Sequence, residues 1–236
     1  MKITVTELKQ ILIEKKIEFL FHVNTVSTSI VFFHQKGLLS RGAVEERGFF
    51  QTPQRTDNKD KELDIFNDIF FDSVDIHERA KTPNSYGPVT FIYSINVLDI
   101  LYNEEIRITQ DNPICWEPSW SDDERYFMDV ERIRNEYKKG KFRQHLTIHN
   151  IHYPLPFSPY LVKVLIEDPG IEYADYFEKA YNALHDIMNQ KGITAPLEKR
   201  QCSQDCKCRE KYRSHKPGYI YYRFQVEEAL NIIRNK

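Results

Sequence analysis

Three cysteines and one histidine lie close together near the C-terminus, in the order Cys202-x3-Cys206-x-Cys208-x6-His215. Thiolate sulfur and imidazole nitrogen are the ligands of tetrahedral structural zinc sites, and metal binding supplies folding free energy to segments that cannot form a core. Residues 196–218 are such a polar segment. The spacing therefore predicts one zinc ion bound by these four residues. The alternative is a flexible loop whose cysteines are reduced and bind no metal.

Basic side chains alternate with these cysteines, together with one aromatic residue, Tyr212. Lysine and arginine can bind a nucleic-acid backbone, and an aromatic ring can stack on a base. The segment is therefore a candidate nucleic-acid contact, within an enzyme or as a non-catalytic zinc-containing nucleic-acid-binding module. The alternative is an ordinary solvated surface. The basic residues are Lys199, Arg200, Lys207, Arg209, Lys211 and Arg213.

Acidic residues gather between positions 57 and 78, where eight of them face two lysines for a net charge of −6. Four of them, Asp64, Asp68, Asp72 and Asp75, are spaced four, four and three residues apart. In a helix this spacing places side chains on one face, where carboxylates could bind Mg²⁺. A metal-dependent nuclease is therefore an alternative function. The simpler interpretation is a solvated helix face.

A second group of candidate residues lies in a series of short motifs. The run FLFHVN at 19–24 ends a predicted strand, a predicted helix follows, and Gly37-Leu38-Leu39 comes next. Residues 75–79 then read DIHER, and residues 86–93 read YGPVTFIY. This order resembles the DarT family of ADP-ribosyltransferase toxins, which have a YHIT-like strand end, a GLL-like helix exit, an I-x-x-R-R-like segment and a YVPFYF-like strand.

The resemblance covers residues 17–102, agrees only in the order of elements over 120–168, and does not extend to 170–236. It implies an NAD-dependent ADP-ribosyltransferase, an enzyme of the glycosyltransferase class. Such an enzyme cleaves NAD at the nicotinamide glycosidic bond and transfers ADP-ribose to a nucleobase, so NAD is a substrate and DNA or RNA the acceptor. The resemblance also implies a toxin of a toxin–antitoxin or phage-defence (antiviral) system, with an antitoxin protein as partner.

Particular residues receive roles from the resemblance. His22 would bind a ribose of NAD, with Asn24 nearby, and Arg79 would be the catalytic arginine. Tyr86 and Phe91 would line the nicotinamide side. The residue types suit the chemistry, because an arginine can hold a pyrophosphate by two hydrogen bonds and an aromatic face can stack on nicotinamide.

Each of these residues also has a purely structural interpretation. His22 could be a histidine at the core edge that hydrogen-bonds a backbone carbonyl. Arg79 could pair with Asp75 or Glu78 in the same acidic stretch. Tyr86 could be a turn residue before Gly-Pro.

One feature of the family is missing. The family has a catalytic glutamate at the start of the strand before an LPF-like turn, whereas residues 142–148 contain no carboxylate. Gln144 and His145 are nearest to the expected place. His145 could act as general base, because imidazole titrates near neutrality, whereas Gln144 could only orient a substrate. Otherwise Glu117 or Glu124 supplies the carboxylate, or the transfer activity is lost.

Alternation along a strand separates these two candidates. In a strand over 142–148, Gln144 shares a face with apolar residues, and His145 shares the polar face with Arg143. The polar face is the better candidate for an open cleft. We therefore predict that His145 is the base, with Arg143 beside it as a phosphate contact.

Helices and strands must position these residues. Capping and periodicity predict helices at 5–15, 27–36 with Gly37 as C-cap, 96–101, 121–140, 172–191 and 226–234. Strands are predicted at 17–23, 89–95, 142–148 and 161–166, a strand or helical turn at 65–74, and loops at 49–64 and 196–218. The mixture indicates an α+β fold with an ADP-ribosyltransferase-like split β-sheet, peripheral helices and a C-terminal Cys-rich helical annex. We expect an ADP-ribosyltransferase-like domain at 1–168 and a helical segment at 169–236 packed on it.

Composition limits the remaining possibilities. The chain has 236 residues, 41% of them hydrophobic and 13% aromatic, with a formal charge of −2, which excludes a disordered protein. No apolar run approaches the roughly 18 residues of a membrane span. The start, MKITVTELKQ, lacks the apolar stretch of a signal peptide. We therefore expect a cytoplasmic protein with no membrane partner.

Overall fold

Three β-sheets form the centre of the part of the chain that the computed structural model describes, residues 3–236. The largest has the strand order β1-β4-β8-β9, the second β3-β6-β5, and the smallest pairs β2 with β7. Only the β8–β9 pairing is parallel among these. The strands are β1 (Phe19–Asn24), β2 (Gly37–Leu38), β3 (Ile69–Phe71), β4 (Val89–Ser94), β5 (Ile106–Ile108), β6 (Leu146–Ile148), β7 (Leu155–Pro156), β8 (Leu161–Ile166) and β9 (Leu197–Lys199).

The two larger sheets meet at one isolated bridge. Phe21 of β1 and Asp72, just after β3, exchange two backbone N–H···O bonds of 2.9 Å. Apart from this bridge, β1 and β3 belong to different sheets. The predicted α+β class with a split sheet is therefore confirmed, and the bridge marks a seam between the two halves.

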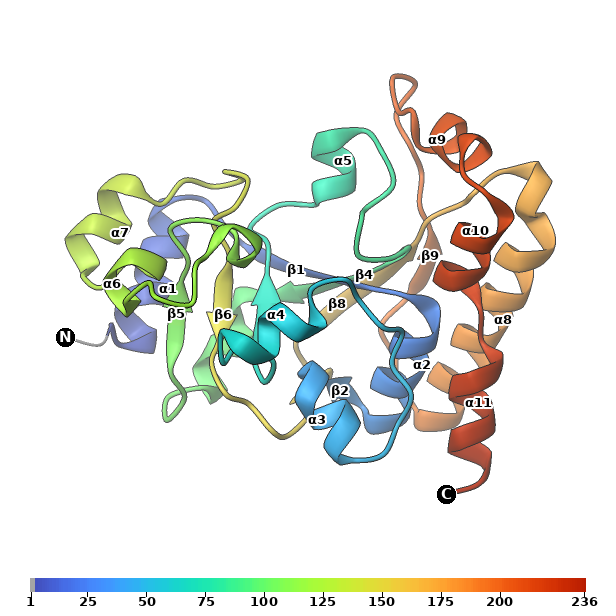
Figure 1. Cartoon of the computed structure of the whole chain (residues 1–236), viewed down its shortest axis with the longest axis horizontal. Coiled ribbons are helices and arrows are strands. Elements are labelled where there is room, and N and C mark those ends of the chain that lie inside the picture. The colour runs from blue at the N-terminus through green and yellow to red at the C-terminus, as the bar shows by residue number, and fades with distance from the viewer. Residues whose placement is uncertain (1–2) are drawn as a thin grey trace.

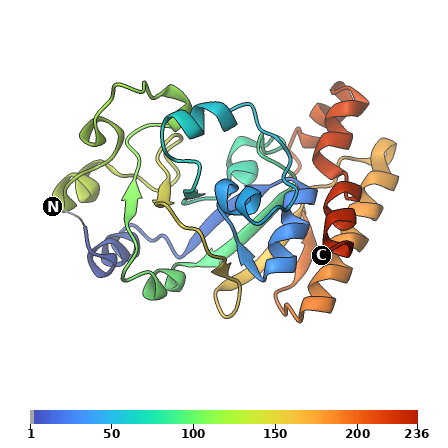
Figure 2. The same ribbon diagram turned by 60° about the horizontal axis from the view of Figure 1, so that its bottom comes forward.

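Helices cover the sheets from both ends of the molecule (Figures 1 and 2). At one end, α1 packs against the 3₁₀ helix η1 and against α7. At the other, the apolar α2, whose residues 26–33 are buried, packs against α8, α10 and α11. The helices are α1 (Val5–Glu14), α2 (Val26–Gln35), α3 (Arg41–Glu46), α4 (Asp57–Glu62), α5 (Ile76–Ala80), α6 (Asp122–Arg125), α7 (Val130–Glu136), α8 (Ala174–Lys191), α9 (Cys208–Ser214), α10 (Pro217–Phe224) and α11 (Glu227–Arg234), with 3₁₀ helices η1 (Ile95–Ile100), η2 (Pro113–Cys115) and η3 (Ile171–Tyr173).

Most predicted elements agree with the structure, and the differences have local causes. The left-handed residue at the end of α2 is Lys36 (φ 57°), and Gly37 instead begins β2. A Cβ on Gly37 would lie 2.4 Å from the carbonyl oxygen of Leu155, so the close strand pairing requires glycine. The predicted loop at 49–64 contains α4, and the predicted helix at 121–140 is two short helices, α6 and α7.

The strand predicted at 142–148 is shorter than expected. Arg143 has a positive φ of 80°, which interrupts an extended strand, so β6 begins only at Leu146. The alternation argument therefore does not apply to Gln144 and His145, which precede the strand.

None of the helices among residues 3–236 is both long and apolar enough to cross a membrane.

Candidate active site

A cavity lies at the seam between the two larger sheets. β1 contributes residues 21–24, β3 and its end contribute Phe70 and Asp72, and His145 enters from the segment before β6. The chain between β2 and β3, which includes α3 and α4, forms another wall with Arg41, Asp60 and Asp68. Tyr86 and Asn112 complete the polar lining. The β1 sheet and the β3 sheet separate at this point, and side chains do not fill the space between them.

His22 presents one ring nitrogen without a partner. Its Nδ1 lies 2.9 Å from the carbonyl oxygen of Phe70, which can only accept, so Nδ1 carries the proton. Burial lowers the pKa of His22, so the ring is neutral near pH 7. Its Nε2 is buried and makes no hydrogen bond within residues 3–236. The structural interpretation of His22, a hydrogen bond to a backbone carbonyl, therefore holds for Nδ1. The other nitrogen, Nε2, can accept a hydrogen bond from a hydroxyl group.

His145 is held between a carboxylate and an amide. Its Nδ1 lies 3.1 Å from Oδ1 of Asp72, and its Nε2 lies 3.3 Å from Nδ2 of Asn112. An ionised carboxylate only accepts, so with the proton on Nδ1 the Nε2 lone pair accepts from the Asn112 amide, and a substrate must displace that amide to reach Nε2. This is the arrangement of a general base whose tautomer and orientation are fixed by an acid.

Asn24 and Tyr86 lie together because of the glycine between Tyr86 and β4. A Cβ on Gly87 would lie 2.0 Å from the backbone carbonyl of Asn24, so only glycine allows this approach. Asn24 is buried, and its Oδ1 accepts from the backbone N–H of Thr25 at 2.9 Å. The Tyr86 side chain is 43% exposed, which leaves a ring face for a ligand at the edge of the cavity.

Three further buried polar atoms of the lining make no hydrogen bond within the described chain. They are Nε and Nη1 of Arg41 and Oδ2 of Asp68, of which Nε forms an ion pair. Arg41 also binds Asp57, with Nε 2.7 Å from Oδ1, and its Nη2 donates to Asp57 Oδ2 at 2.9 Å. Asp68 Oδ1 accepts from the backbone N–H of Asn150 at 2.9 Å. Buried polar groups are almost always paired, so these atoms together with His22 Nε2 indicate a site for a polar ligand.

Burial also changes the acidity of the cavity carboxyls. It raises the pKa of Asp60 to about 6, and the charge of Asp68 contributes in the same direction. Burial raises the pKa of Asp68 as well, against the hydrogen bond from His149. The cavity therefore combines acidic groups with the guanidinium of Arg41.

The structure brings four of the predicted site residues to this cavity: His22, Asn24, Tyr86 and His145. It does not bring Gln144 there, because that side chain is buried on the other side, where its Oε1 accepts from the backbone N–H of Lys138 at 3.0 Å. Arg143 instead lies 3.2 Å from Asp111 and is exposed.

Phe91 and Arg79 also lie outside the cavity, contrary to the roles that the resemblance gave them. Phe91 is fully buried in the core and stacks on Phe157 at 5.8 Å. Arg79 lies in a separate hollow beyond the Phe21 bridge, where its guanidinium stacks 4.0 Å from the Phe142 ring centre. Asp75, a predicted partner of Arg79, instead caps α5 and binds Arg200 at 2.6 Å.

Carboxylates do line the cavity, but they are not the two residues suggested from the sequence. Glu124 forms the capping box of α6 with Ser121, and neither Glu124 nor Glu117 lines the cavity. Asp60, Asp68 and Asp72 line it instead. For Asp72 and Asn112 the sequence contains no signal, whereas Arg41 follows the Gly-Leu-Leu motif by two residues.

The four acids predicted to share a helix face are separated by the fold. Asp64 is a turn residue with φ 59°, and Asp75 binds Arg200. Asp68 binds His149 at 2.9 Å, and Asp72 binds His145. They lie in turns and strand ends rather than in one helix, so the geometry proposed for a magnesium-dependent nuclease is wrong.

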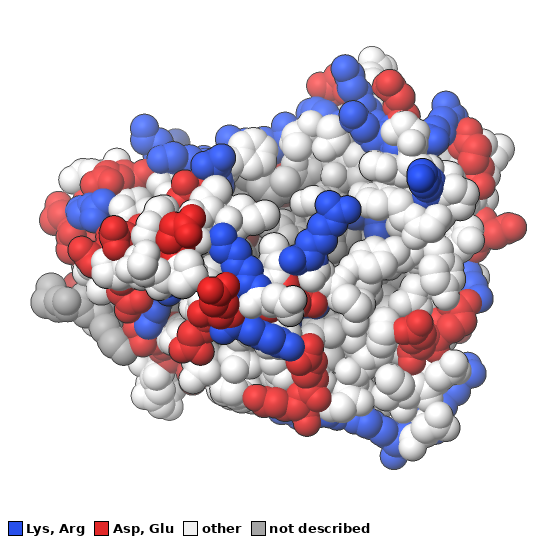
Figure 3. Space-filling model, in the orientation of Figure 1, with Lys and Arg blue, Asp and Glu red and all other residues white. Residues whose placement is uncertain are grey.

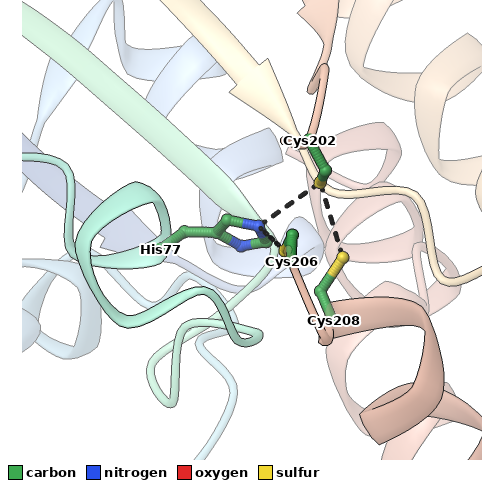
Figure 4. Close-up of side chains that lie close together, drawn as sticks. All are labelled: His77, Cys202, Cys206 and Cys208. Carbon is green, nitrogen blue, oxygen red and sulfur yellow. Dashed lines mark hydrogen bonds between the residues drawn. The ribbon is translucent and has the colours of Figure 1, made fainter. Parts of the chain in front are cut away.

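The cysteine cluster does form, with a different histidine. Ligand atoms of His77, Cys202, Cys206 and Cys208 all lie within 4.8 Å of one another (Figure 4). The predicted fourth ligand, His215, is not in this group, because it ends α9 and stacks on Tyr219 with ring centres 4.0 Å apart. His77 was missed because it lies 125 residues from Cys202 in the sequence.

Four of the six basic residues around the cysteines, Lys199, Arg200, Arg209 and Arg213, bind acids of the same chain. Arg200 binds Asp75, and Lys199 and Arg209 bind Asp168 at 3.0 and 2.7 Å. Tyr212 is fully buried and donates its hydroxyl to Glu167, so it cannot stack on a base as predicted.

Comparison with solved structures finds similarity to DarT of Thermus sp. 2.9. The match to its complex with ADP-ribosylated ssDNA has a TM-score of 0.48 at 8% identity, and covers 78% of this chain and 95% of that chain. The match to its NAD+ complex has a TM-score of 0.46 at 10% identity, and covers 78% and 96%. The match to its carba-NAD+ complex has a TM-score of 0.45 at 9% identity, with the same coverage. Similarity of this degree assigns no role to any residue of this chain. No protein-family model and no curated protein matches the sequence.

Proposed function

We propose that this protein is an NAD-dependent ADP-ribosyltransferase that modifies a base of DNA or RNA. One observation carries the proposal: two histidines with different hydrogen-bond partners line the same cavity. His22 offers a neutral acceptor nitrogen without a partner, and His145 is oriented by Asp72 as a base. The motif order of the sequence independently predicts an NAD site at His22 and Asn24.

The cavity offers contacts for three parts of NAD: a ribose, the pyrophosphate and the nicotinamide. His22 Nε2 accepts from a ribose hydroxyl. Arg41 Nη1 donates to a pyrophosphate oxygen, so Arg41 takes the part that the motif comparison gave to Arg79. The half-exposed ring of Tyr86 stacks on the nicotinamide or on the acceptor base.

The reaction follows from these contacts. The bond between nicotinamide and C1′ of its ribose breaks, and the electron pair leaves with nicotinamide. The cavity carboxylates stabilise the oxocarbenium-like charge that develops on the ribose. A nitrogen of the acceptor base then bonds to C1′, and its proton passes to Nε2 of His145. Asp72 stabilises the imidazolium that forms.

The surface supports a nucleic-acid acceptor. Residues 131–143 carry a net charge of +4. Lys and Arg side chains lie along the top of the face shown in Figure 3 and near its centre, whereas Asp and Glu lie mainly at its left, lower and right sides. A row of basic side chains can bind the phosphate backbone while the target base enters the cavity.

The biological setting follows from the sequence resemblance alone. A toxin of a toxin–antitoxin or phage-defence system should arrest growth when expressed, and the His145→Ala variant should not. An antitoxin partner would be sought among proteins or enzymes that reverse that arrest.

The direct test is to incubate the protein with NAD and single-stranded DNA or RNA oligonucleotides and to measure intact oligonucleotide masses. The proposal predicts a mass increase of one ADP-ribosyl group and release of one nicotinamide. His185→Ala, which changes an exposed histidine of α8, is the matched control and should react like the wild type. No NAD consumption with any oligonucleotide would contradict the proposal. Strand cleavage that needs Mg²⁺ but not NAD would favour the nuclease instead.

A further inference from the structure

A cluster of three thiols and one imidazole lies apart from the cavity, between α5 and the start of α9. Figure 4 shows the four side chains pointing toward one another from opposite sides. Sγ of Cys202 lies 3.4 Å from Sγ of Cys208 and 3.5 Å from Nε2 of His77, and Sγ of Cys206 lies 3.4 Å from the same nitrogen. The cysteines form no disulfide.

These distances suit a tetrahedral metal site. With Zn–S bonds of about 2.3 Å and Zn–N bonds of about 2.0 Å, the edges of the tetrahedron measure about 3.8 Å between sulfurs and about 3.5 Å from nitrogen to sulfur. The two nitrogen–sulfur distances of 3.5 and 3.4 Å match the second value. The Cys202–Cys208 distance of 3.4 Å is shorter than the first value, and all four ligand atoms lie within 4.8 Å of one another. An S₃N set of ligands favours zinc over the oxygen-seeking cations.

A hydrogen bond to Glu167 orients His77 as a metal ligand. Its Nδ1 donates to Oε1 of Glu167 at 2.6 Å, and the Glu167 side chain is fully buried. The carboxylate fixes the proton on Nδ1, which leaves the Nε2 lone pair facing the sulfurs. Glu167 is itself held by the hydroxyl of Tyr212 and the backbone N–H of Asn84. A carboxylate that orients a histidine in this way is the usual support of a metal ligand.

The surrounding segment needs such a support. The chain between β9 and α9 is polar, and few apolar side chains hold it to the rest of the molecule. Its backbone contacts α5 through the N–H of Lys207, which donates to the carbonyl oxygen of Lys81 at 2.8 Å. A metal at the cluster would join two segments that are more than a hundred residues apart in the sequence.

We infer that His77, Cys202, Cys206 and Cys208 bind one zinc ion as a closed structural site that fastens α5 to the C-terminal segment. Four protein ligands leave no open position for a substrate, so the ion has no direct part in catalysis. The zinc site is connected to the cavity through a chain of contacts. His77 binds Glu167, Glu167 accepts from the backbone N–H of Asn84, and Tyr86 of the cavity lies two residues after Asn84. Arg223 strengthens this connection, because its guanidinium donates to the carbonyl oxygens of Asn84 and Ser85.

The first experiment measures metal in the wild-type protein, purified without chelator from cells supplied with zinc. Elemental analysis should find close to one zinc per chain, and X-ray absorption should find about three sulfurs at ~2.3 Å and one nitrogen at ~2.0 Å. Substantially less than one equivalent, or a shell of oxygen atoms, would overturn the inference. A disulfide between Cys202 and Cys208 in place of the metal would also overturn it.

Variants identify the fourth ligand. His77→Ala and Cys206→Ser should lose the zinc, whereas His215→Ala and Cys115→Ser should keep it. Zinc that persists in His77→Ala but is lost from His215→Ala would contradict the site described here. If His77→Ala does not fold, His215→Ala decides: it should keep one zinc per chain, and loss of the zinc from it would contradict the site described here.

Removal of the metal tests the structural role without any enzyme assay. Chelation should lower the Tm by at least about 10 °C, because binding of the ion contributes to the free energy of folding. Hydrogen exchange should then rise in residues 76–86 and 200–208 but not in α1. An unchanged Tm and exchange pattern in demonstrably metal-free protein would refute the role. None of these measurements requires NAD, so they are independent of the proposed transferase activity.

Discussion

The carboxylate of Asp72 and the imidazole of His145 meet at the end of the β3–β6 pairing, beside the seam between the two larger sheets, with Oδ1 3.1 Å from Nδ1. Asp72 is fixed there by its backbone bridge to Phe21, and the backbone N–H of His145 donates to the hydroxyl of Thr109 at 2.8 Å. The pairing of β3 with β6 and the bridge to β1 therefore position both partners. In the proposed reaction this pair supplies the base, in a chain that has no glutamate in the 142–148 segment.

His145→Ala should lower the rate of ADP-ribosyl transfer by about 10² to 10⁴ and leave NAD binding intact, because the base acts on the acceptor. Asp72→Asn should lower the rate less, since the imidazole remains but loses its orientation. Initial rates of nicotinamide release measure both effects. The control is His152→Ala, an exposed histidine that binds Glu46 at 3.1 Å. Equal rates for His145→Ala and the control would exclude His145 as the base.

Arg41→Lys should weaken NAD binding about tenfold or more, because lysine keeps the charge but loses the planar fork that binds a pyrophosphate. Arg79→Ala should bind NAD like the wild type, since Arg79 lies beyond the Phe21 bridge. Titration calorimetry with NAD compares the two variants. The opposite ranking would mean that α5 moves toward the cavity when NAD binds.

Asp60→Asn should stabilise the protein at pH 7.5 and have less effect near pH 4. Burial raises the pKa of Asp60 from 3.8 to about 6 in the folded state, so the folded protein binds the proton more tightly than the unfolded chain. The carboxylate therefore destabilises the fold above pH 6, and this effect disappears as the pH falls toward 4. Because Asp60 is partly exposed, we expect a gain of about 1 kcal/mol, or a Tm higher by about 2–4 °C.

Thermal melts at both pH values measure this difference. Asp186→Asn, at an exposed position of α8, is the matched control and should change the Tm little at either pH. A gain for Asp60→Asn that is equally large at pH 4 would show that the effect is not electrostatic.

Phe91→Ala should destabilise the protein by about 3–5 kcal/mol, because Phe91 is fully buried between Phe32, Phe33 and Phe157. Denaturant unfolding measures the loss. NAD affinity of the fraction that remains folded should not change, since the ring lies outside the cavity. A folded variant with normal stability and weak NAD binding would contradict this prediction and would support a role for Phe91 in the nicotinamide site.

Local signals in the sequence predicted much of the fold. The capping box at Thr4 and the β-rich runs around His22 and Phe91 identify α1, β1 and β4 correctly, because each signal acts within a few residues. No local signal predicts that Arg143 takes a left-handed conformation, which shortens β6. His145 nevertheless lies in the cavity, for a reason other than strand alternation.

The site was less predictable because its contacts are long-range. His77 and Cys202 are 125 residues apart, and Asp72 and His145 are brought together only by the pairing of β3 with β6. Arg79 and Phe91 were assigned by motif similarity, which gives residue types but not the direction of a side chain. Burial then decides that Phe91 belongs to the core.

The central claim is that the seam cavity binds NAD through His22, and an NAD titration followed by calorimetry tests it most directly. The wild type should give a saturable isotherm. His22→Ala should bind roughly 3- to 10-fold more weakly, as expected for the loss of one hydrogen bond of about 1 kcal/mol, and His152→Ala should match the wild type. Absence of binding by the wild type at millimolar NAD, or equal affinity of wild type and His22→Ala, would contradict the account.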